Sequence, residues 1–585
     1  MAPKAIPLFC GIATILVVLL ASTSLAQDKD RTEELKQNVL KELGLDTLSL
    51  DESPADDLAV KDGSDKVILH ALNGLVLLPK QDLVNQTPAR KGEIDNQLEG
   101  APENLVEALS GFLGQPLTLN LLADVNRTIN RVYREDDRPV VDAYLPEQDV
   151  SSGVVQLVVT EGLLGEVRVE GAERSDPDYL IRQIKTEPGS SIRQSDLGWD
   201  LDWLNDHPFR KVKMIFEPGE TDGTTDIVLQ TTDAKPLRLH TGIDNTGLEL
   251  TGENQWDFGI TWGRVFNTEQ IAAYQYTTDL EFESLEAHSL FYRIPLPWRH
   301  RIDLVGALVK SDAELFSGDD AIGVGGESSL AGLEYVIPIR SRLFDLSKSE
   351  LSFGTDYKTT NSDLEFGGQN VFDETASVLQ FSLGWKGARP DKLGATGLGL
   401  GLTWSPGNSI GNNDESSFEA QRTGASPDYL YTEMTLERLI KLPMSWNLTF
   451  SGTGQWSNSR LISTEQLLAG GYRTVRGFDE NLIRGDAGFV GSLELIAPPV
   501  SVAQLLGQNF NDELTTAFFL DAAWLSSNDS IEGEVDQEIS SLGLEMRYNW
   551  GSNWLMRAGY GWHLSSDGVD EDGSGRLHFG ATLRY

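Results

Sequence analysis

The chain has 585 residues and a formal net charge of −42, because 89 acidic residues outnumber 47 Lys and Arg residues. This charge argues against nucleic acid as a partner, since it would repel a polyanion. Hydrophobic residues make up 40% of the chain and include 13 Trp, which excludes a disordered protein. Beyond the first two dozen residues, no apolar run reaches the ~18 positions of a membrane-spanning helix. The composition therefore excludes a helical membrane protein and leaves a membrane β-barrel open.

Residues 1–26 have the pattern of a secretory signal peptide. Lys4 gives a basic start, residues 6–21 form an apolar segment, and Ser24-Leu25-Ala26 is a small-x-small cleavage site. We therefore expect an exported chain that begins at Gln27. The single cysteine, Cys10, lies in the removed segment, so the exported chain has no thiol for a disulfide, a metal or a nucleophile. A lipoprotein modified at Cys10 is the weaker alternative, because little apolar sequence precedes it.

Residues 27–65 have the acidic composition of a solvated tail. Within this tail, residues 31–43 carry apolar side chains at helical spacing, so one amphipathic helix is an alternative to a plain linker.

Residues 66–236 contain one pattern of elements twice. The first copy, 66–162, predicts a strand at 66–78, helices near 101–112 and 117–134, and strands at 140–145 and 154–159. The second copy, 163–236, predicts a strand at 165–169, helices near 176–185 and 193–205, and strands at 211–216 and 226–230. Such a unit of about 75 residues is a small α+β module, and its repetition suggests an array of binding domains.

From residue 237 to residue 585 the sequence alternates with a period of two. In the last segment, for example, Leu577 and Phe579 alternate with Arg576 and His578. One face is apolar and the other is rich in Gly and charge, which is typical of a membrane barrel with a polar lumen and not of a soluble sandwich. The pattern predicts sixteen antiparallel strands, near 237–244, 255–263, 269–278, 286–294, 301–310, 324–337, 344–359, 375–387, 393–405, 429–439, 444–456, 487–496, 514–524, 538–549, 553–563 and 575–585.

The connections between these strands alternate in length and charge. Short connections such as 299–301 and 389–392 are basic, whereas long ones such as 279–283 and 529–536 are acidic. If the first strand starts in the periplasm, the short turns are periplasmic and the acidic loops face outward. The connection at 497–513 is an exception to this scheme, because it is long for a periplasmic turn.

The eleventh connection, about 457–486, contains the motif Val475-Arg476-Gly477-Phe478. By itself, an Arg-Gly-aromatic turn is compatible with an ordinary surface hairpin. Its position after the eleventh strand of sixteen, in a chain with two preceding modules, resembles the two-partner secretion transporters of the haemolysin secretion/activation family. In that family a similar motif tips the long sixth extracellular loop, which folds back into the lumen.

Three further segments carry the resemblance. Pro146-Glu147-Gln148 and Glu161-Gly162 are similar to the end of the family's first periplasmic POTRA module. Phe519-Leu520-Asp521 is similar to the Phe-x-Asp-x-Gly motif of strand thirteen, although Ala523 replaces the final Gly. Tyr585 stands where the family has a C-terminal aromatic residue, usually Phe, which the barrel-insertion machinery reads. The resemblance implies POTRA modules at 66–162 and 163–236, followed by a barrel at 237–585.

The resemblance also implies a function. The chain would reside in the bacterial outer membrane, among its lipids, with the POTRA modules in the periplasm. The modules would bind an unfolded, β-helical exoprotein, and the barrel would export it. Residues 31–43 would correspond to a plug helix that some members thread through the pore, although no residue-level match supports this.

Arg476 and Asp521 are the predicted site of the barrel. An arginine that enters a narrow lumen loses hydration, and a wall carboxylate replaces the lost contacts. We expect Arg476 to contact Asp521 and so to set the conformation of the loop. In the alternative interpretation, this pair only stabilises the barrel.

Other classes of function have less support. Zinc-protease, serine-hydrolase and phosphate-loop motifs are absent from the sequence, so we predict no enzyme, no catalytic residue, no metal and no cofactor. Cation binding by the acidic loops is a minor alternative. A barrel-assembly or insertion factor is the main rival, although such factors usually carry a different number of POTRA modules. A diffusion porin has no reason to carry roughly 210 periplasmic residues.

Overall fold

The computed structural model describes residues 66–85, 92–221, 223–317, 320–340, 348–366, 369–569 and 573–585. The predicted signal peptide, the acidic tail and the helix expected at 31–43 lie outside these residues. The chain divides into two compact units, which separate at residues 235 and 236. Within the described ranges, no helix combines the length and the apolar character needed to cross a membrane.

The first module is a four-stranded sheet with two helices. Its elements are β1 (Gly74–Leu78), η2 (Gln81–Leu83), β2 (Ile94–Asn96), α2 (Leu105–Ser110), α3 (Leu119–Glu135), β3 (Val141–Tyr144) and β4 (Val154–Glu161), and the strand order is β2-β1-β4-β3. Helix α3 buries Leu121, Val125 and Ile129 against the sheet because they share one face at spacings of four. Thr118 caps this helix by accepting a 3.0 Å hydrogen bond from the Leu121 N–H.

The strand expected at 66–78 is wrong in its first half, because only residues 74–78 form β1. Four consecutive leucine and valine residues after Gly74 favour a buried strand, whereas the residues before it do not form one. Strand β2 was not predicted, since three residues are too few to show alternation.

The second α+β module has a three-stranded sheet. Its elements are β5 (Leu163–Glu170), α4 (Pro177–Gln183), α5 (Gln194–Asn205), β6 (Arg210–Pro218) and β7 (Thr224–Asp233), and the strand order is β5-β7-β6. The carboxylate of Asp137, just after α3, accepts hydrogen bonds from the N–H and the hydroxyl of Ser195 at 2.7 and 2.6 Å. This contact satisfies an N–H group in the first turn of α5 with a side chain of the first module, and so joins the two modules.

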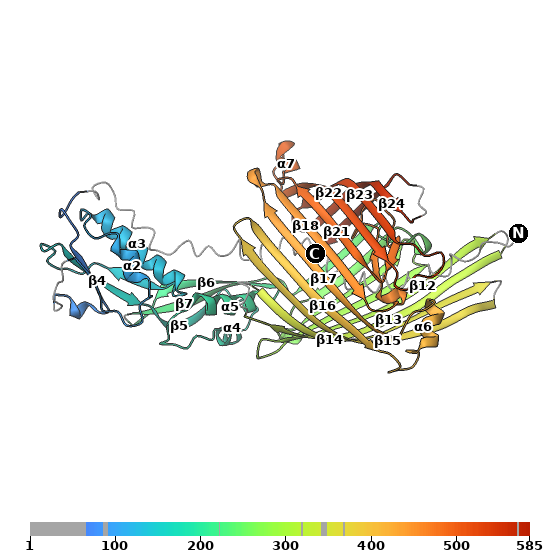
Figure 1. The fold of residues 1–585 in the computed structure, drawn as a ribbon, viewed down its shortest axis with the longest axis horizontal. Helices are drawn as coiled ribbons and strands as arrows, with labels where there is room; N and C mark the ends of the chain where they lie inside the picture. Colours follow the sequence, from blue (N-terminus) through green and yellow to red (C-terminus); the bar gives the residue numbers. More distant parts are fainter. Residues whose placement is uncertain are drawn as a thin grey trace. The chain divides into compact units, whose positions relative to one another are not determined.

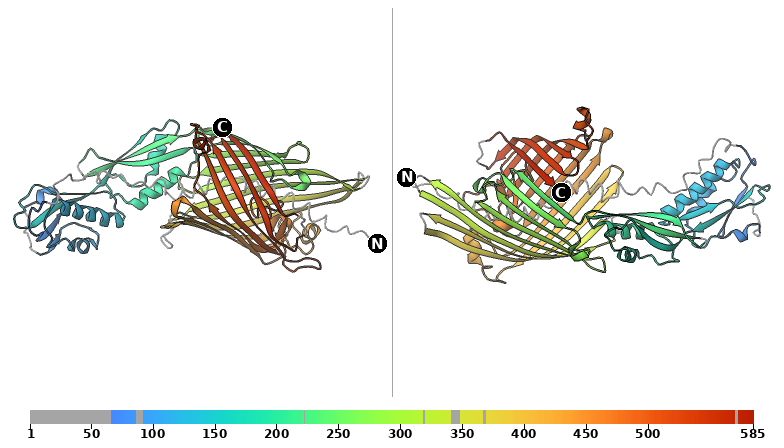
Figure 2. Two further views of the ribbon diagram at one scale, coloured as in Figure 1. Left: turned by 90° about the horizontal axis from the view of Figure 1, so that it is seen from above. Right: turned by 180° about the vertical axis from the view of Figure 1, so that it is seen from behind.

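All sixteen segments predicted as barrel strands are strands, and they close into one antiparallel barrel (Figures 1 and 2). The predicted fold class is therefore confirmed. The strands are β8 (Leu237–Asp244), β9 (Gln255–Trp262), β10 (Ile271–Asp279), β11 (Leu285–Pro295), β12 (Arg301–Ser317), β13 (Asp320–Pro338), β14 (Lys348–Phe366), β15 (Gln369–Asp391), β16 (Gly394–Pro406), β17 (Asp428–Lys441), β18 (Asn447–Ser457), β21 (Ala487–Ile496), β22 (Asp512–Ser526), β23 (Gln537–Trp550), β24 (Trp554–Asp567) and β25 (Gly575–Arg584).

The faces of the wall follow the predicted alternation. In β23, Leu542 and Met546 are exposed, whereas Ser541 and Glu545 are buried. The outer face is thus apolar and the inner face polar, as lipid and a narrow lumen require. Strands β12 to β15 have 17 to 23 residues and extend beyond the predicted segments. A strand that extends beyond the lipid no longer needs an apolar outer face. Its apolar–polar alternation can therefore end before its hydrogen bonds to the neighbouring strands do, and a prediction from alternation is then too short.

The barrel closes between β25 and β8. Five residue pairs, 580–584 with 240–244, form the strand pairing of this seam, against eight between β8 and β9, and the backbones of Tyr585 and Leu239 add one more hydrogen-bonded pair. The carboxamide of Asn245 extends the seam by accepting from the Phe579 N–H at 2.8 Å and donating to the Leu577 carbonyl at 2.7 Å.

The connections hold the remaining elements. Residues 458–486, which we call the lumen loop, join β18 to β21 and contain η6 (Ser463–Glu465), β19 (Leu467–Ala469) and β20 (Ile483–Gly485). The long connection at 497–511 contains α7 (Val502–Leu505), which accounts for its length. The others are η3 (Glu249–Thr251), η4 (Val265–Asn267), α6 (Glu415–Gln421) and η5 (Pro443–Ser445).

Candidate functional site

The predicted motif Val475-Arg476-Gly477-Phe478 forms the tip of the lumen loop and lies inside the barrel. Val475 and Phe478 are fully buried, in a cluster with Ala523 and Leu525 of β22 and Ile539 of β23. Gly477 has a φ of 97°, a left-handed conformation that favours glycine. Two apolar side chains thus pin the tip to the wall, and the turn between them directs Arg476 toward strands β21 to β23.

The structure brings Arg476 and Asp521 together. The Arg476 Nε and Nη2 atoms donate to the two carboxylate oxygens of Asp521 at 2.7 and 2.8 Å, a bidentate pairing. The Arg476 backbone N–H also donates to Asp521, at 3.1 Å. The guanidinium carbon lies 3.7 Å from the centre of the Phe519 ring. The predicted wall residues therefore both contact the Arg476 guanidinium: Phe519 stacks against its flat face, and Asp521 accepts hydrogen bonds at its edge.

Two further carboxylates, which the sequence did not single out, complete this cluster. The Arg476 Nη1 donates to Glu494 of β21 at 2.6 Å and to Glu545 of β23 at 2.7 Å. Arg547 of β23 bonds to the same two carboxylates. Two cations therefore face three carboxylates, and the Asp521 and Glu545 side chains are fully buried. Such a cluster is stable only while every charge keeps its partners.

A second anchor holds the N-terminal part of the lumen loop to another part of the wall, strands β14 and β17. Glu465, whose side chain is 1% exposed, accepts a hydrogen bond from the Lys358 Nζ of β14 at 2.8 Å. The Tyr431 hydroxyl of β17 lies 3.4 Å from the same carboxylate. The loop is thus tied both to strands β21 to β23 and to strands β14 and β17, so it bridges the lumen.

The base of the lumen loop is tied to two neighbouring loops. The buried carboxylate of Asp486 accepts from Arg422, after α6, at 2.5 Å and from the Asn528 N–H, after β22, at 2.9 Å. Arg460 pairs with Glu534 at 2.7 and 2.8 Å. The Arg460 hydrogen bonds hold the pKa of Glu534 below its ordinary value, although partial burial opposes them. Three connections at this end therefore form one bonded cap.

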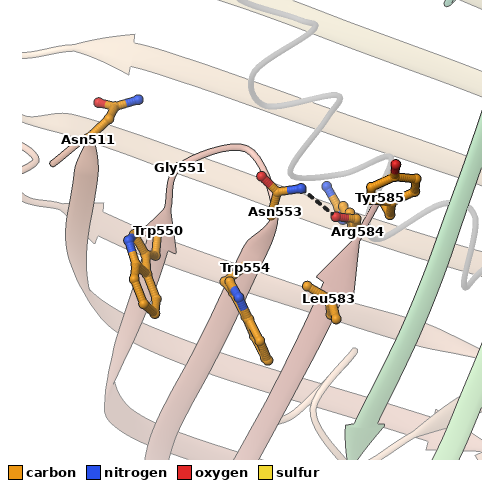
Figure 3. A pocket seen from close by; sticks show the side chains of 8 residues that line it. All are labelled: Asn511, Trp550, Gly551, Asn553, Trp554, Leu583, Arg584 and Tyr585. Carbon is orange, nitrogen blue, oxygen red and sulfur yellow. Dashed lines mark hydrogen bonds between the residues drawn. The ribbon is translucent and has the colours of Figure 1, made fainter. Parts of the chain in front are cut away.

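The predicted C-terminal residue, Tyr585, lies away from this site, at the end of β25. Its backbone pairs with Leu239 of β8, and its side chain is 81% exposed. It lines a shallow pocket of about 450 Å³ where Trp550 and Trp554 flank the turn between β23 and β24 (Figure 3). The pocket is lined by Asn511, Trp550, Gly551, Asn553, Trp554, Leu583, Arg584 and Tyr585. Aromatic side chains at strand ends suit the membrane interface.

The part of the chain that the structure describes holds no cluster of three His, Cys, Asp or Glu residues that could bind a metal ion. The ionisable residues in the lumen instead pair with one another. This site can hold or release a loop.

A closed sixteen-stranded barrel, with a loop bonded inside its lumen and α+β modules before it, is the architecture of outer-membrane proteins that translocate or insert polypeptides. The family described as "Haemolysin secretion/activation protein ShlB/FhaC/HecB" matches residues 223–548, and "POTRA domain, ShlB-type" matches residues 93–162. The chain belongs to the haemolysin secretion/activation family of two-partner secretion transporters, which confirms the resemblance seen in its sequence.

Relatives of known function agree with this assignment. The chain is 22% identical over 443 residues to the heme/hemopexin transporter protein HuxB of Haemophilus influenzae strain 86-028NP, covering 71% of this chain and 73% of HuxB. It is 24% identical over 403 residues to the outer membrane transporter CdiB of Escherichia coli O6:K15:H31, covering 64% and 63%. Both relatives are named as transporters.

Solved structures show the same fold. CdiB from Escherichia coli superposes with a TM-score of 0.67 at 17% identity and covers 95% of this chain and 98% of CdiB. CdiB from Acinetobacter baumannii gives a TM-score of 0.56 at 16% identity, with 97% and 99% covered. The two-partner secretion assignment fits better than the barrel-insertion alternative, because both the family match and the named relatives are two-partner secretion transporters.

Proposed function

We propose that this transporter exports one unfolded, β-helical exoprotein, and that release of the lumen loop opens its path. The observation that carries the proposal is the bonded crossing of the lumen. Arg476 holds the loop on one part of the wall, and Glu465 holds it on another. A polypeptide cannot share a lumen crossed in this way, so transport requires some of these bonds to break.

We propose Arg476 and Asp521 as the central contact of this lock. The bidentate geometry and the burial support the assignment, because a desolvated arginine resists displacement as long as its carboxylates are present. Glu494 and Glu545 share the guanidinium, so displacement must break contacts with three strands together. Val475, Gly477 and Phe478 shape the tip that presents Arg476.

We also propose the division of the chain into a signal peptide at 1–26, a tail at 27–65, POTRA modules at 66–162 and 163–236, and a barrel at 237–585. The second module carries the same order of two helices and two final strands as the first, which supports its assignment as a POTRA domain. Both modules would bind the arriving exoprotein from the periplasm by strand addition.

Further proposals concern the two ends of the chain and its chemistry. Tyr585, at the end of β25, would be the signal that the barrel-insertion machinery reads. Residues 31–43 would be a linker or a plug helix. We expect transport without a catalytic residue, a metal or a cofactor, with lipid and the exoprotein as the partners.

The proposal is tested by measuring secretion of the cognate exoprotein from cells that carry this transporter. We propose that each transport cycle starts from the docked loop, so Arg476→Ala and Asp521→Ala, which remove its main contact, should each reduce secretion at equal barrel levels. Arg438→Ala is a matched control, since Arg438 pairs with the Asp391 carboxylate at the barrel rim and not with the loop. Secretion at the wild-type rate by both loop-site variants would overturn the lock. Insertion of foreign barrels without secretion of the exoprotein would favour an insertion factor.

A further inference from the structure

We infer that two wall histidines, His563 of β24 and His578 of β25, are positioning residues that hold the lumen loop by the backbone of Gly477. We call this pair the histidine clamp. The inference rests on the loop lock proposed above and adds a second determinant of its closed position. Unlike the carboxylates around Arg476, the clamp does not depend on the Arg476 side chain.

The histidine clamp contacts both the backbone N–H and the backbone carbonyl of Gly477. The Gly477 N–H donates to the His578 Nε2 at 3.0 Å, and the Gly477 carbonyl oxygen lies 2.6 Å from the His563 Nε2. His578 is 2% exposed, so its hydrogen bond is shielded from water. Because the two bonds act on the two peptide units that flank one α-carbon, a rotation of either unit breaks a bond.

Between the two histidines, the backbone of the loop tip approaches the backbone of β24 closely. A Cβ atom on Gly477 would lie 2.6 Å from the carbonyl oxygen of Gly561 on β24, and a Cβ on Gly561 would lie 2.5 Å from the Arg476 carbonyl oxygen. Both contacts are too short for any side chain, so the loop tip rests directly on β24. The Phe478 ring then stacks on the His563 ring, with centroids 3.9 Å apart and planes within 3°.

The two rings have different positions in these hydrogen bonds. His578 accepts at Nε2, so that nitrogen carries no proton. The two ring nitrogens of His563 lie 2.6 and 2.8 Å from the carbonyl oxygens of Gly477 and Gly573, so each nitrogen is placed to donate. Histidine is suited to both tasks, because its ring nitrogens can act as acceptor or donor, whereas an aliphatic side chain supplies neither role.

The test follows the position of the loop by cysteine labelling of the full-length transporter in lipid vesicles. A Val475→Cys probe is made in a Cys10→Ser background, which removes the only natural cysteine. Val475 is fully buried when the loop is docked, so a polar maleimide reacts with the probe only when the tip leaves the wall. The transport cargo is not needed for this measurement.

Three substitutions at the clamp are compared. His578→Leu removes the acceptor and should speed labelling about tenfold, because the buried Gly477 N–H then loses its partner in the docked state. His578→Gln offers a carbonyl oxygen near the position of Nε2 and should restore slow labelling. His563→Phe keeps the ring stack but removes both donors, and it should speed labelling by a similar factor. Each variant is first checked for the heat-sensitive gel mobility of a folded barrel.

Two controls make the outcomes distinct. His288→Leu, on β11, loses contacts with Tyr274 and Glu286 and should label at the parent rate. Arg476→Ala reports on the lock itself. Fast labelling by Arg476→Ala together with parent rates for His578→Leu and His563→Phe would refute the clamp and leave the lock standing. Parent rates in Arg476→Ala would refute the lock. Equal rates for His578→Leu and His578→Gln would show that ring packing matters and not the hydrogen bond, which also refutes the clamp.

Discussion

Removal of the Arg476 side chain should shift the lumen loop from the docked to the released position by a calculable amount. In the native cluster, two cations face three carboxylates, which leaves a net charge of −1. Arg476→Ala leaves Arg547 alone with Asp521, Glu494 and Glu545, so the net charge becomes −2. Removing one partner of a buried ion pair costs about 3–5 kcal/mol. A change of this size alters the equilibrium constant by a factor of roughly 10² to 4 × 10³.

A double-mutant cycle with Asp521→Asn tests this reasoning. Alone, Asp521→Asn removes the bidentate partner of Arg476 and should also release the loop. Combined with Arg476→Ala, it removes a carboxylate that no longer has a cation, so it should add little or even restore docking. Loop release is read from the labelling rate of a single cysteine at the tip. If the effects of the two substitutions add within about 0.5 kcal/mol, the two residues are not coupled and the argument fails.

Three further predictions follow from other contacts. Lys358→Met leaves the buried Glu465 carboxylate without its cation. This variant should raise the frequency of channel openings in planar bilayers. An unchanged frequency would show that the contact between Lys358 and Glu465 does not hold the lumen loop. Gly477→Ala places a methyl group 2.6 Å from a carbonyl oxygen of β24, so it should release the loop; labelling at the parent rate would contradict that close contact. In the second module, partial burial would raise the pKa of Asp233, but hydrogen bonds from residues 174–175 outweigh it and hold the pKa below its ordinary value. A depressed pKa gives stability that is present above the unfolded-state pKa and is lost as the pH falls through the folded-state pKa. Acid unfolding of the full chain, followed by protease sensitivity of this module, should therefore begin at higher pH in Asp233→Asn, and an unchanged onset would count against the linkage.

The barrel was predictable because each strand carries its own signal. Outward residues such as Leu542 and inward residues such as Glu545 obey a period of two, which any reader of the sequence can count. The long hairpins were underestimated: β12 continues to residue 317 and β15 begins at residue 369, beyond the predicted ends at 310 and 375.

The site was predictable only in part. The motif around Arg476 and the carboxylate of Asp521 came from the family resemblance. Alternation alone places Glu545, Arg547, His563 and His578 on the inner face, but it cannot say which of them the loop reaches. That choice depends on the curvature of the closed barrel and on where the loop turns, and neither leaves a local pattern in the sequence. Asp486 and Glu465 lie in irregular segments, where no period exists to mark a buried carboxylate.

The short seam between β8 and β25 has a consequence for how this chain folds. Its side-chain bond joins Asn245 to the backbone of Phe579, 334 residues later. Bringing such distant residues together costs about 5 kcal/mol of loop entropy before a single seam bond forms. Closure is therefore expected to be the last and slowest step, since non-local pairing delays folding. Until the final ten residues have been synthesised and exported, both edge strands stay unpaired and able to bind other strands, and the unfinished chain must be kept from aggregating in the periplasm.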